Sequence, residues 1–330
     1  MTHSPNLKEA INALPPGQRG LVVLTAQSNI SGIKHPFGRL LRRAKERRWD
    51  TALDAAAYIP TTPLNLSAHS EIDFLPCSWY KVLGYPTGIG SLIVRRDAIT
   101  KLRKEHFSGG TVTYVHNGRW DEFHLFGDAG EWDARRFEDG SLNFQSFVPL
   151  EMGLRRILDV SPTFREDVQN RVGVLSSWLI ERLPVVRWIG TGHPVVRLVG
   201  FPKPHAEHGG TIGMVFYDEC GGKIPFTAIE REAVIRKIHL RCGCMCNYVA
   251  RLANPGNDGF PPEVGPDAIS SVDWKYDSST REWVLREVAT GEFSETGVLR
   301  VSLGMPSRFE DVWEVWKLVK DFGEGRVRWK

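Results

Sequence analysis

The sequence has few cysteines and no long apolar run. Five cysteines occur in 330 residues, and three of them crowd into RCGCMC at 241–246. This odd number and close spacing do not fit a secreted disulfide framework, so we expect a reducing, cytoplasmic compartment. No apolar stretch reaches the roughly 18 residues that span a bilayer, and the N-terminus lacks a signal-peptide core. We therefore expect no membrane association.

The sequence also lacks a large excess of charge of either sign. The formal net charge is +3, which is too small a bias to predict a nucleic-acid partner. The densest basic run is RLLRRAKERR at 39–48, and it has helical spacing. It is expected to be a solvated helix face, with a phosphate-binding patch as the alternative.

Short apolar strands and amphipathic helices alternate in the first part of the chain. Strands are predicted at 21–26, 51–58, 72–78 and 90–96, and a helix at 37–49. This order favours an α/β fold with a parallel or mixed sheet, whose ligands bind at the carboxyl ends of the strands.

The order of predicted helices and strands changes after about residue 150. Two amphipathic helices are predicted at 141–160 and 164–183, followed by strands among Gly and Pro turns. We expect two domains, an α/β domain at 1–150 and a smaller α+β domain at 151–330. The Pro- and Gly-rich stretch 254–266 is expected to be a loop or lid.

Lys81 lies in an unusual setting, within SWYKVLGYPTGIGSLIVRR at 78–96. Its neighbours Trp79, Tyr80 and Val82 are apolar, whereas a lysine used for solubility usually sits among other charges. One interpretation is a turn lysine whose stem packs on Trp79 while its ammonium reaches water. The other is a Schiff-base lysine, which requires desolvation and nearby positive charge.

Polar side chains lie in or just after three consecutive predicted strands. Asn29 and Ser31 follow the first, Asp54 lies in the second, and Ser78 ends the third, three residues before Lys81. A carboxylate at such a position can pair with a protonated ring nitrogen, which is how proteins tune pyridoxal phosphate as an electron sink. The combination points to a site for this cofactor.

Several motifs carry a resemblance to a known family. They are AQSNISGIKHP, LDAAAYIPTTPLNLS, DFLPCSWYKVLGYPTGIGSLIVR, FSGGTV, RRFEDGSLNF and RCGCMCN, in this order. The chain from about residue 20 to its end resembles the class V aminotransferase fold, a pyridoxal-phosphate-dependent transferase fold of type I. Within it, the chain is similar to the desulfurase domain of the molybdenum cofactor sulfurase branch.

The resemblance implies a role for each of several residues. Lys81 would bind the cofactor covalently, Asp54 would pair with its pyridine nitrogen, and Asn29 would lie near its ring hydroxyl and the substrate. Ser78 would hold the phosphate. Arg300 would bind the substrate carboxylate; a surface ion pair is the alternative for this guanidinium. Help with the phosphate would come from the turn SGGT, through Gly109, Gly110 and Thr111, in the site of a neighbouring subunit.

The cysteine-rich segment would carry the sulfur. In the family a cysteine here accepts sulfur from L-cysteine as a persulfide, and Cys246 is the first candidate and Cys244 the second. The attacking group is a thiolate, which requires exposure and local positive charge. Burial as inert small side chains is one alternative. Zinc binding is another, although C-x-C-x-C lacks the usual ligand spacing, and we expect no metal.

The chain departs from the family pattern in two ways that bear on activity. Tyr248 and Val249 stand where the sulfurases usually have Pro-Gly, which changes the loop of the nucleophile. The N-terminal part of the large domain, with its phosphate cradle, is not found before the AQSN strand. We expect that part to come from another chain, or the protein to be a truncated or degenerate relative.

These observations predict a cysteine desulfurase that depends on pyridoxal 5'-phosphate and forms a homodimer. Its substrate would be L-cysteine or a related amino acid, and its persulfide would pass sulfur on. Two alternatives stay open. One is another class V enzyme, a C–S lyase or an aminotransferase. The other is a non-catalytic interaction subunit.

Overall fold

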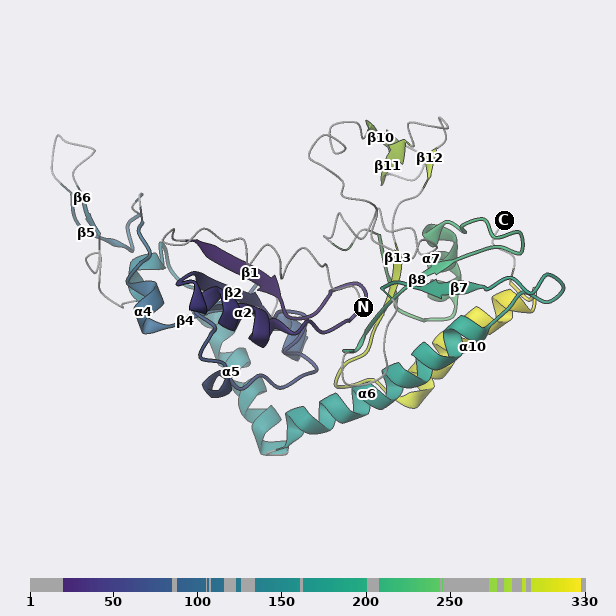
Figure 1. The fold of residues 1–330 in the computed structure, drawn as a ribbon, viewed down its shortest axis with the longest axis horizontal. Helices are drawn as coiled ribbons and strands as arrows, with labels where there is room; N and C mark the ends of the chain where they lie inside the picture. Colours follow the sequence, from purple (N-terminus) through teal and green to yellow (C-terminus); the bar gives the residue numbers. More distant parts are fainter. Residues whose placement is uncertain are drawn as a thin grey trace. The chain divides into compact units, whose positions relative to one another are not determined.

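The structure is a computed structural model, and it forms two compact units (Figure 1). The N-terminal unit contains residues 4–26 and 36–165, and the C-terminal unit contains residues 1–3, 27–35 and 166–330. The predicted domain boundary at residue 150 falls inside a helix, and the units divide at 165. The structure describes residues 20–84, 88–104, 106, 108–115, 123–125, 134–160, 163–200, 208–243, 245, 273–277, 282–286, 293–294 and 298–327.

A four-stranded sheet forms the centre of the N-terminal unit. Its strands are β1 (Leu21–Thr25), β2 (Asp50–Asp54), β3 (Phe74–Ser78) and β4 (Gly90–Val94), in the order β1-β2-β3-β4. The first three strands are parallel, and β4 is antiparallel to β3. The expectation of a parallel or mixed sheet is confirmed, and the carboxyl ends of β1, β2 and β3 meet at one edge.

Helix α2 (Phe37–Glu46) connects β1 and β2 and covers one face of this sheet. Its residues Phe37, Leu40, Leu41 and Ala44 recur at helical spacing and are all buried. They pack on the apolar side chains of β1 and β2 that point to the same face. Arg39 and Arg42 lie on the outer, exposed side, whereas Lys45 pairs with the buried Asp73 carboxylate, so only part of the basic run is a solvated helix face.

The sheet is followed by shorter elements and one long helix. Helix α3 (Tyr80–Leu83) is a single turn after β3, and α4 (Arg96–Ile99) follows β4. Strands β5 (Val112–Val115) and β6 (Phe123–Leu125) form a small antiparallel pair. Helix α5 (Phe144–Val160) closes the N-terminal unit. The short 3-10 helices are Leu66–Ala68 and Ala134–Phe137.

An antiparallel sheet forms the centre of the C-terminal unit. It contains β7 (Val196–Leu198), β8 (Thr211–Phe216), β13 (Val298–Ser302) and β9 (Arg241–Gly243), in the order β7-β8-β13-β9. Helix α7 (Phe226–Ile235) contacts β9 and β13. The other elements are the 3-10 helix Leu183–Val185 and the strands β10 (Asp273–Asp277), β11 (Glu282–Arg286) and β12 (Phe293–Ser294), which form a separate sheet.

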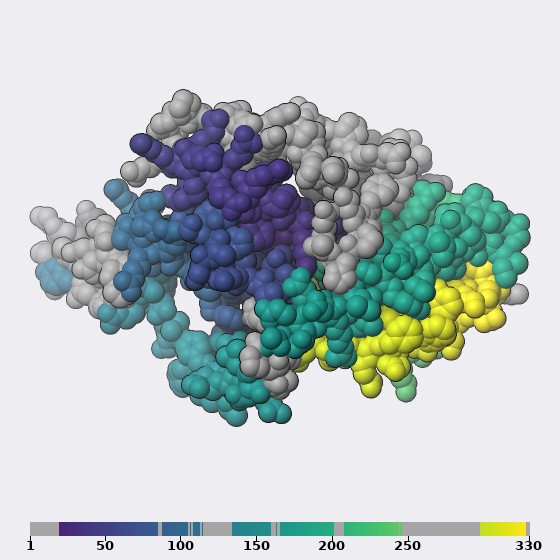
Figure 2. All heavy atoms as spheres, turned by 60° about the horizontal axis from the view of Figure 1, so that its bottom comes forward, coloured from purple at the N-terminus to yellow at the C-terminus, as the bar shows by residue number. Residues whose placement is uncertain are grey.

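Two long helices of the C-terminal unit meet through aromatic side chains. Helix α6 (Phe164–Arg182) and helix α10 (Phe309–Gly323) run beside one another in Figure 1, and their atoms are in contact in Figure 2. The ring of Trp178 on α6 lies 5.1 Å from that of Phe309 and 6.1 Å from that of Trp316, measured between centroids. Helix α6 occurs where the sequence predicts a helix, at 164–183.

Candidate functional site

The carboxyl edge of the N-terminal sheet holds two of the predicted cofactor residues. Asp54 is the last residue of β2, and Ser78 is the last residue of β3. These strands are parallel, with Ala52 opposite Phe74, so Asp54 and Ser78 lie at the same edge. The Asp54 carboxylate accepts a hydrogen bond of 2.9 Å from the N–H of Ala56. This bond turns the chain out of the sheet and fixes the carboxylate at the strand end.

Lys81 lies on the one-turn helix α3, which begins two residues after the end of β3. The aromatic side chain of Trp79 packs against the core and donates a 2.7 Å hydrogen bond to Ser91 Oγ. Lys81 itself is exposed, and its Nζ lies 6.0 Å from the centroid of the Tyr80 ring. Of the two interpretations of Lys81, this exposure fits the turn lysine in the described single chain, and the Schiff-base role stays a prediction.

A second group of predicted residues meets in the C-terminal unit. The Asn29 side-chain amide donates a 2.7 Å hydrogen bond to the carbonyl oxygen of Met245. Arg300 on β13 donates from Nη1 to the carbonyl oxygen of Asn29 over 2.8 Å. Met245 is buried and has a positive φ of 54°, which places a tight turn inside the cysteine-rich segment. Asn29, Arg300 and this segment are thus joined across more than 200 residues of sequence.

The two predicted nucleophiles flank Met245 in the sequence. Cys244 and Cys246 lie outside the described residues, as do Tyr248 and the predicted loop at 254–266. Cys242, on β9, is half-buried. Since β9 pairs with β13, Arg300 lies opposite Arg241 in the sheet. The start of the cysteine-rich segment is therefore held beside the strand that carries Arg300.

The turn that bears Asn29 is closed by its own hydrogen bonds. Ser28 Oγ accepts from the N–H groups of Ile30 and Ser31, and the N–H of Gly32 donates to the Ser28 carbonyl. Gly32 has φ of +74°, and a Cβ atom there would lie 2.0 Å from the carbonyl oxygen of Thr211 on β8. Only glycine fits this position, because the turn rests directly on the backbone of the C-terminal unit.

One residue of this region was missed by sequence reasoning. His208 is buried, and its ring contacts the carbonyl oxygen of Ser31 in the Asn29 turn. Burial lowers the pKa of this imidazole. In the sequence it lies in PHAEHGG at 204–210, three residues after His205 and directly before two glycines, a pattern that does not by itself mark a site.

The SGGT turn is held together internally. Gly109 and Gly110 are exposed, whereas Thr111 is buried. The Thr111 hydroxyl lies 3.0 Å from Lys104 Nζ and 3.1 Å from Asp139 Oδ1. A phosphate could bind the Thr111 hydroxyl only by replacing these partners, so a role of this turn in phosphate binding stays a prediction.

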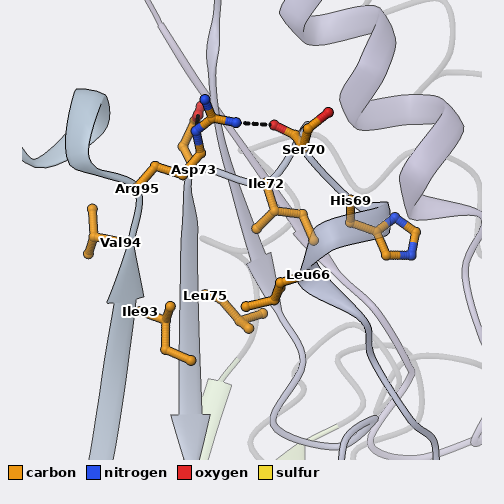
Figure 3. Close-up of a pocket in the computed structure, with 9 residues that line it drawn as sticks. All are labelled: Leu66, His69, Ser70, Ile72, Asp73, Leu75, Ile93, Val94 and Arg95. Carbon is orange, nitrogen blue, oxygen red and sulfur yellow. Dashed lines mark hydrogen bonds and ion pairs between the residues drawn. The ribbon is translucent and has the colours of Figure 1, made fainter.

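A pocket of the N-terminal unit lies at the opposite edge of the sheet (Figure 3). It is next to Asp73, which precedes β3, and Arg95, which follows β4. The buried Asp73 carboxylate lies 2.7 Å from Lys45 Nζ and accepts from the Thr51 N–H over 2.9 Å. Arg95 Nη1 donates to the Ser70 carbonyl. These contacts join the strand ends opposite Asp54 and Ser78, so we assign this pocket no part in the site.

The described residues contain no group of three or more His, Cys, Asp or Glu side chains that could hold a metal ion. None of the described helices is both long and apolar enough to cross a membrane.

Comparison with known proteins identifies the family. The model of the family "Aminotransferase class-V" matches residues 3–197. The chain belongs to this family. The human protein named molybdenum cofactor sulfurase is 34% identical over 233 residues, which are 67% of this chain and 25% of the human protein. The chain thus spans about a quarter of the length of that relative.

Solved structures of the family share the fold. The apo cysteine desulfurase of Thermococcus onnurineus NA1 has a TM-score of 0.67 and 19% identity, and the match covers 97% of this chain and 63% of that one. A C-DES variant, with glycine covalently linked to its pyridoxal phosphate cofactor, has a TM-score of 0.63 and 16% identity. The latter match covers 96% of this chain and 64% of that one. The predicted class V fold is confirmed.

Proposed function

We propose that this chain carries the reactive residues of a pyridoxal-phosphate-dependent cysteine desulfurase of the molybdenum cofactor sulfurase type. The observation that supports the proposal best is the connection of Asn29 to Met245 and to Arg300. It brings a residue proposed to lie beside the cofactor, a proposed carboxylate-binding arginine and the proposed sulfur-accepting segment together in one unit. The names of the similar proteins point to the same activity.

The residues at the sheet edge suit pyridoxal phosphate. When bound, the cofactor supplies an electron sink for bond cleavage at an amino acid. The Asp54 carboxylate, fixed at its strand end, would hold a proton on the ring nitrogen. Lys81 would hold the cofactor and move a proton at the substrate α-carbon, and the Ser78 hydroxyl would bind the phosphate. An amine, a carboxylate and a hydroxyl at one sheet edge are the groups that this cofactor needs.

Arg300 and the cysteine segment would act on the substrate. The guanidinium would bind the carboxylate of L-cysteine, for which its planar fork is suited. A thiolate of Cys246, or of Cys244, would take the sulfur as a persulfide, leaving alanine. In this proposal the protein works as a homodimer in the cytoplasm, and Gly109 and Gly110 face the site of the partner subunit.

The exposure of Lys81 favours a second candidate function. A reactive lysine requires a site that excludes water, and Lys81 is exposed in the described single chain. A non-catalytic subunit that binds a related chain is therefore the alternative. A C–S lyase or aminotransferase is a further alternative within the family, and it would keep its activity in the Cys246→Ala variant.

Borohydride trapping distinguishes these functions. The chain is incubated with pyridoxal phosphate, reduced and digested, and the modified lysine is identified by mass spectrometry. We expect a reduced cofactor adduct on Lys81 that is absent from Lys81→Ala and kept in the control Lys317→Ala, which changes an exposed lysine of α10. No adduct in the unchanged chain would contradict an enzymatic role for this chain alone.

A further inference from the structure

Two arginines lie side by side in the antiparallel sheet of the C-terminal unit. Arg300 on β13 is directly opposite Arg241 on β9. Opposite residues of antiparallel strands point to the same face of the sheet, with their Cβ atoms about 5 Å apart. Like charges in such a position destabilise a sheet, so this pairing is not explained by stability.

The Asn29 turn covers the same face of the sheet. On the other side of Arg300 lies Gly213 of β8, and a Cβ atom there would be 2.9 Å from the carbonyl oxygen of Ile30. Ile30 and Met245 belong to one buried apolar cluster with side chains of this face. The two arginines therefore border the place where the turn and Met245 pack on the sheet.

The two guanidinium groups differ in what holds them. Arg300 is half-buried, and its Nη1 donates to the Asn29 carbonyl over 2.8 Å. This bond orients the guanidinium without neutralising it, because a carbonyl group carries no net charge. Arg241 is exposed and, within the described part of the chain, forms no hydrogen bond or ion pair. Its N–H donors are therefore open to a ligand.

The elements that build this part of the face bring basic side chains and no carboxylate. The turn residues 27–35 include Lys34 but no Asp or Glu, and strands β8, β9 and β13 include no Asp or Glu either. The formal charge of these elements is thus positive, which favours an anionic ligand.

The position of Arg241 on an edge strand suggests a simpler role. Strand β9 is the last strand of its sheet, and a charged side chain at an edge discourages pairing with another chain. That role requires a charge of either sign, and an acidic residue opposite Arg300 would fill it while forming an ion pair. An arginine opposite an arginine fits the recognition of an anion better.

We propose that Arg241 and Arg300 together bind a small dianion, with one acidic group on each guanidinium. A planar guanidinium binds a carboxylate through two parallel hydrogen bonds, and two neighbouring guanidinium groups suit two acidic groups of one small molecule. The meaning of this site rests on the proposed function. With the α-carboxylate of an amino acid on Arg300, Arg241 selects a substrate whose side chain ends in a second acidic group, whereas L-cysteine uses Arg300 alone.

Titration with simple carboxylates tests the site in the protein without added cofactor. Malonate supplies two carboxylates and acetate one, and both are added at constant ionic strength so that screening does not differ. NMR of the backbone amides and of the arginine Nε–H groups follows binding. We expect malonate to bind at least about tenfold more tightly than acetate, with shifts at Arg241 and Arg300. Equal affinities, or shifts that spare these two residues, would overturn the inference without the need for a variant.

Variants separate Arg241 from the other basic residues. Arg241→Gln should lower the affinity for malonate to that for acetate, and Arg241→Lys, which keeps the charge but not the planar fork, should fall between. The control is Arg231→Gln, which changes an exposed arginine of α7 in the same unit and should keep the preference for malonate. A preference that persists in Arg241→Gln would contradict the inference.

The two proposals fail in different ways. Malonate binding at Arg241 and Arg300 without a cofactor adduct on Lys81 would contradict the proposed function alone. A cofactor adduct on Lys81 without preferential malonate binding would contradict the two-arginine site alone.

Discussion

At the scale of single residues, two histidines contribute to the response of the C-terminal unit to mildly acidic pH. Burial lowers the pKa values of both His35 and His208 below the usual 6.5. The folded chain therefore binds fewer protons than the unfolded chain as the pH falls below 6.5, and its free energy of unfolding decreases there. Above this range both rings are neutral in both states, and the contribution to stability is fully present.

Urea unfolding measures this effect. We expect a lower midpoint at pH 5.5 than at pH 7.5, and a smaller difference for His208→Gln than for the unchanged protein. His193→Gln is the matched control. Equal pH dependence in the two variants would show that burial of His208 does not contribute.

The residues of the candidate site were predictable to different degrees. Asp54 and Ser78 could be assigned to strand ends, because the apolar runs before them are short and clear. The approach of Asn29 to Met245 and Arg300 could not be derived from spacing, because it depends on the tertiary packing of segments more than 200 residues apart. His208 was missed because its significance lies in two backbone carbonyls, which leave no mark in the side-chain pattern.

At the scale of elements, the closest fit is between the Asn29 turn and β8. Alanine at Gly32 would place its Cβ 2.0 Å from the Thr211 carbonyl oxygen and would retain a φ of +74°. The left-handed backbone alone costs about 1–2 kcal/mol, and the contact with the backbone adds to it. We expect Gly32→Ala to lower the free energy of unfolding by at least about 2 kcal/mol.

Gly190→Ala is the control for this prediction. Gly190 also has a positive φ, of 102°, but no atom lies within 4 Å of its added Cβ. This variant should lose only the backbone contribution of about 1 kcal/mol. Denaturant unfolding of both variants measures the difference, and equal losses would mean that the turn does not rest on β8 as described.

Two elements end earlier than the sequence predicts, because the chain turns before the predicted pattern ends. The helix expected at 37–49 ends at Glu46, because Arg48 adopts a positive φ of 61° and reverses the chain. The strand expected at 51–58 ends at Asp54, where the carboxylate binds the Ala56 N–H. Helices α5 and α6 agree with the expected ranges within three residues, since their amphipathic pattern is long.

At the scale of the whole molecule, residues 27–35 belong to a unit that the order of elements does not indicate. They follow β1 directly, yet they pack with the C-terminal unit through Gly32, Ile33 and Asn29. Periodicity predicts what each segment forms but not which core it joins. The division near residue 150 was therefore expected at one place in the sequence, whereas the chain passes between units more than once.

Each unit has a core of its own, which predicts how the molecule unfolds. Leu41 on α2 and Ile229 on α7 are both completely buried, one in each unit. Truncation of a buried leucine or isoleucine to alanine costs about 2–5 kcal/mol. If the units unfold as separate cooperative steps, Leu41→Ala should lower one calorimetric transition by several degrees, and Ile229→Ala should lower the other. A single transition that both variants shift equally would mean that the units stabilise one another strongly.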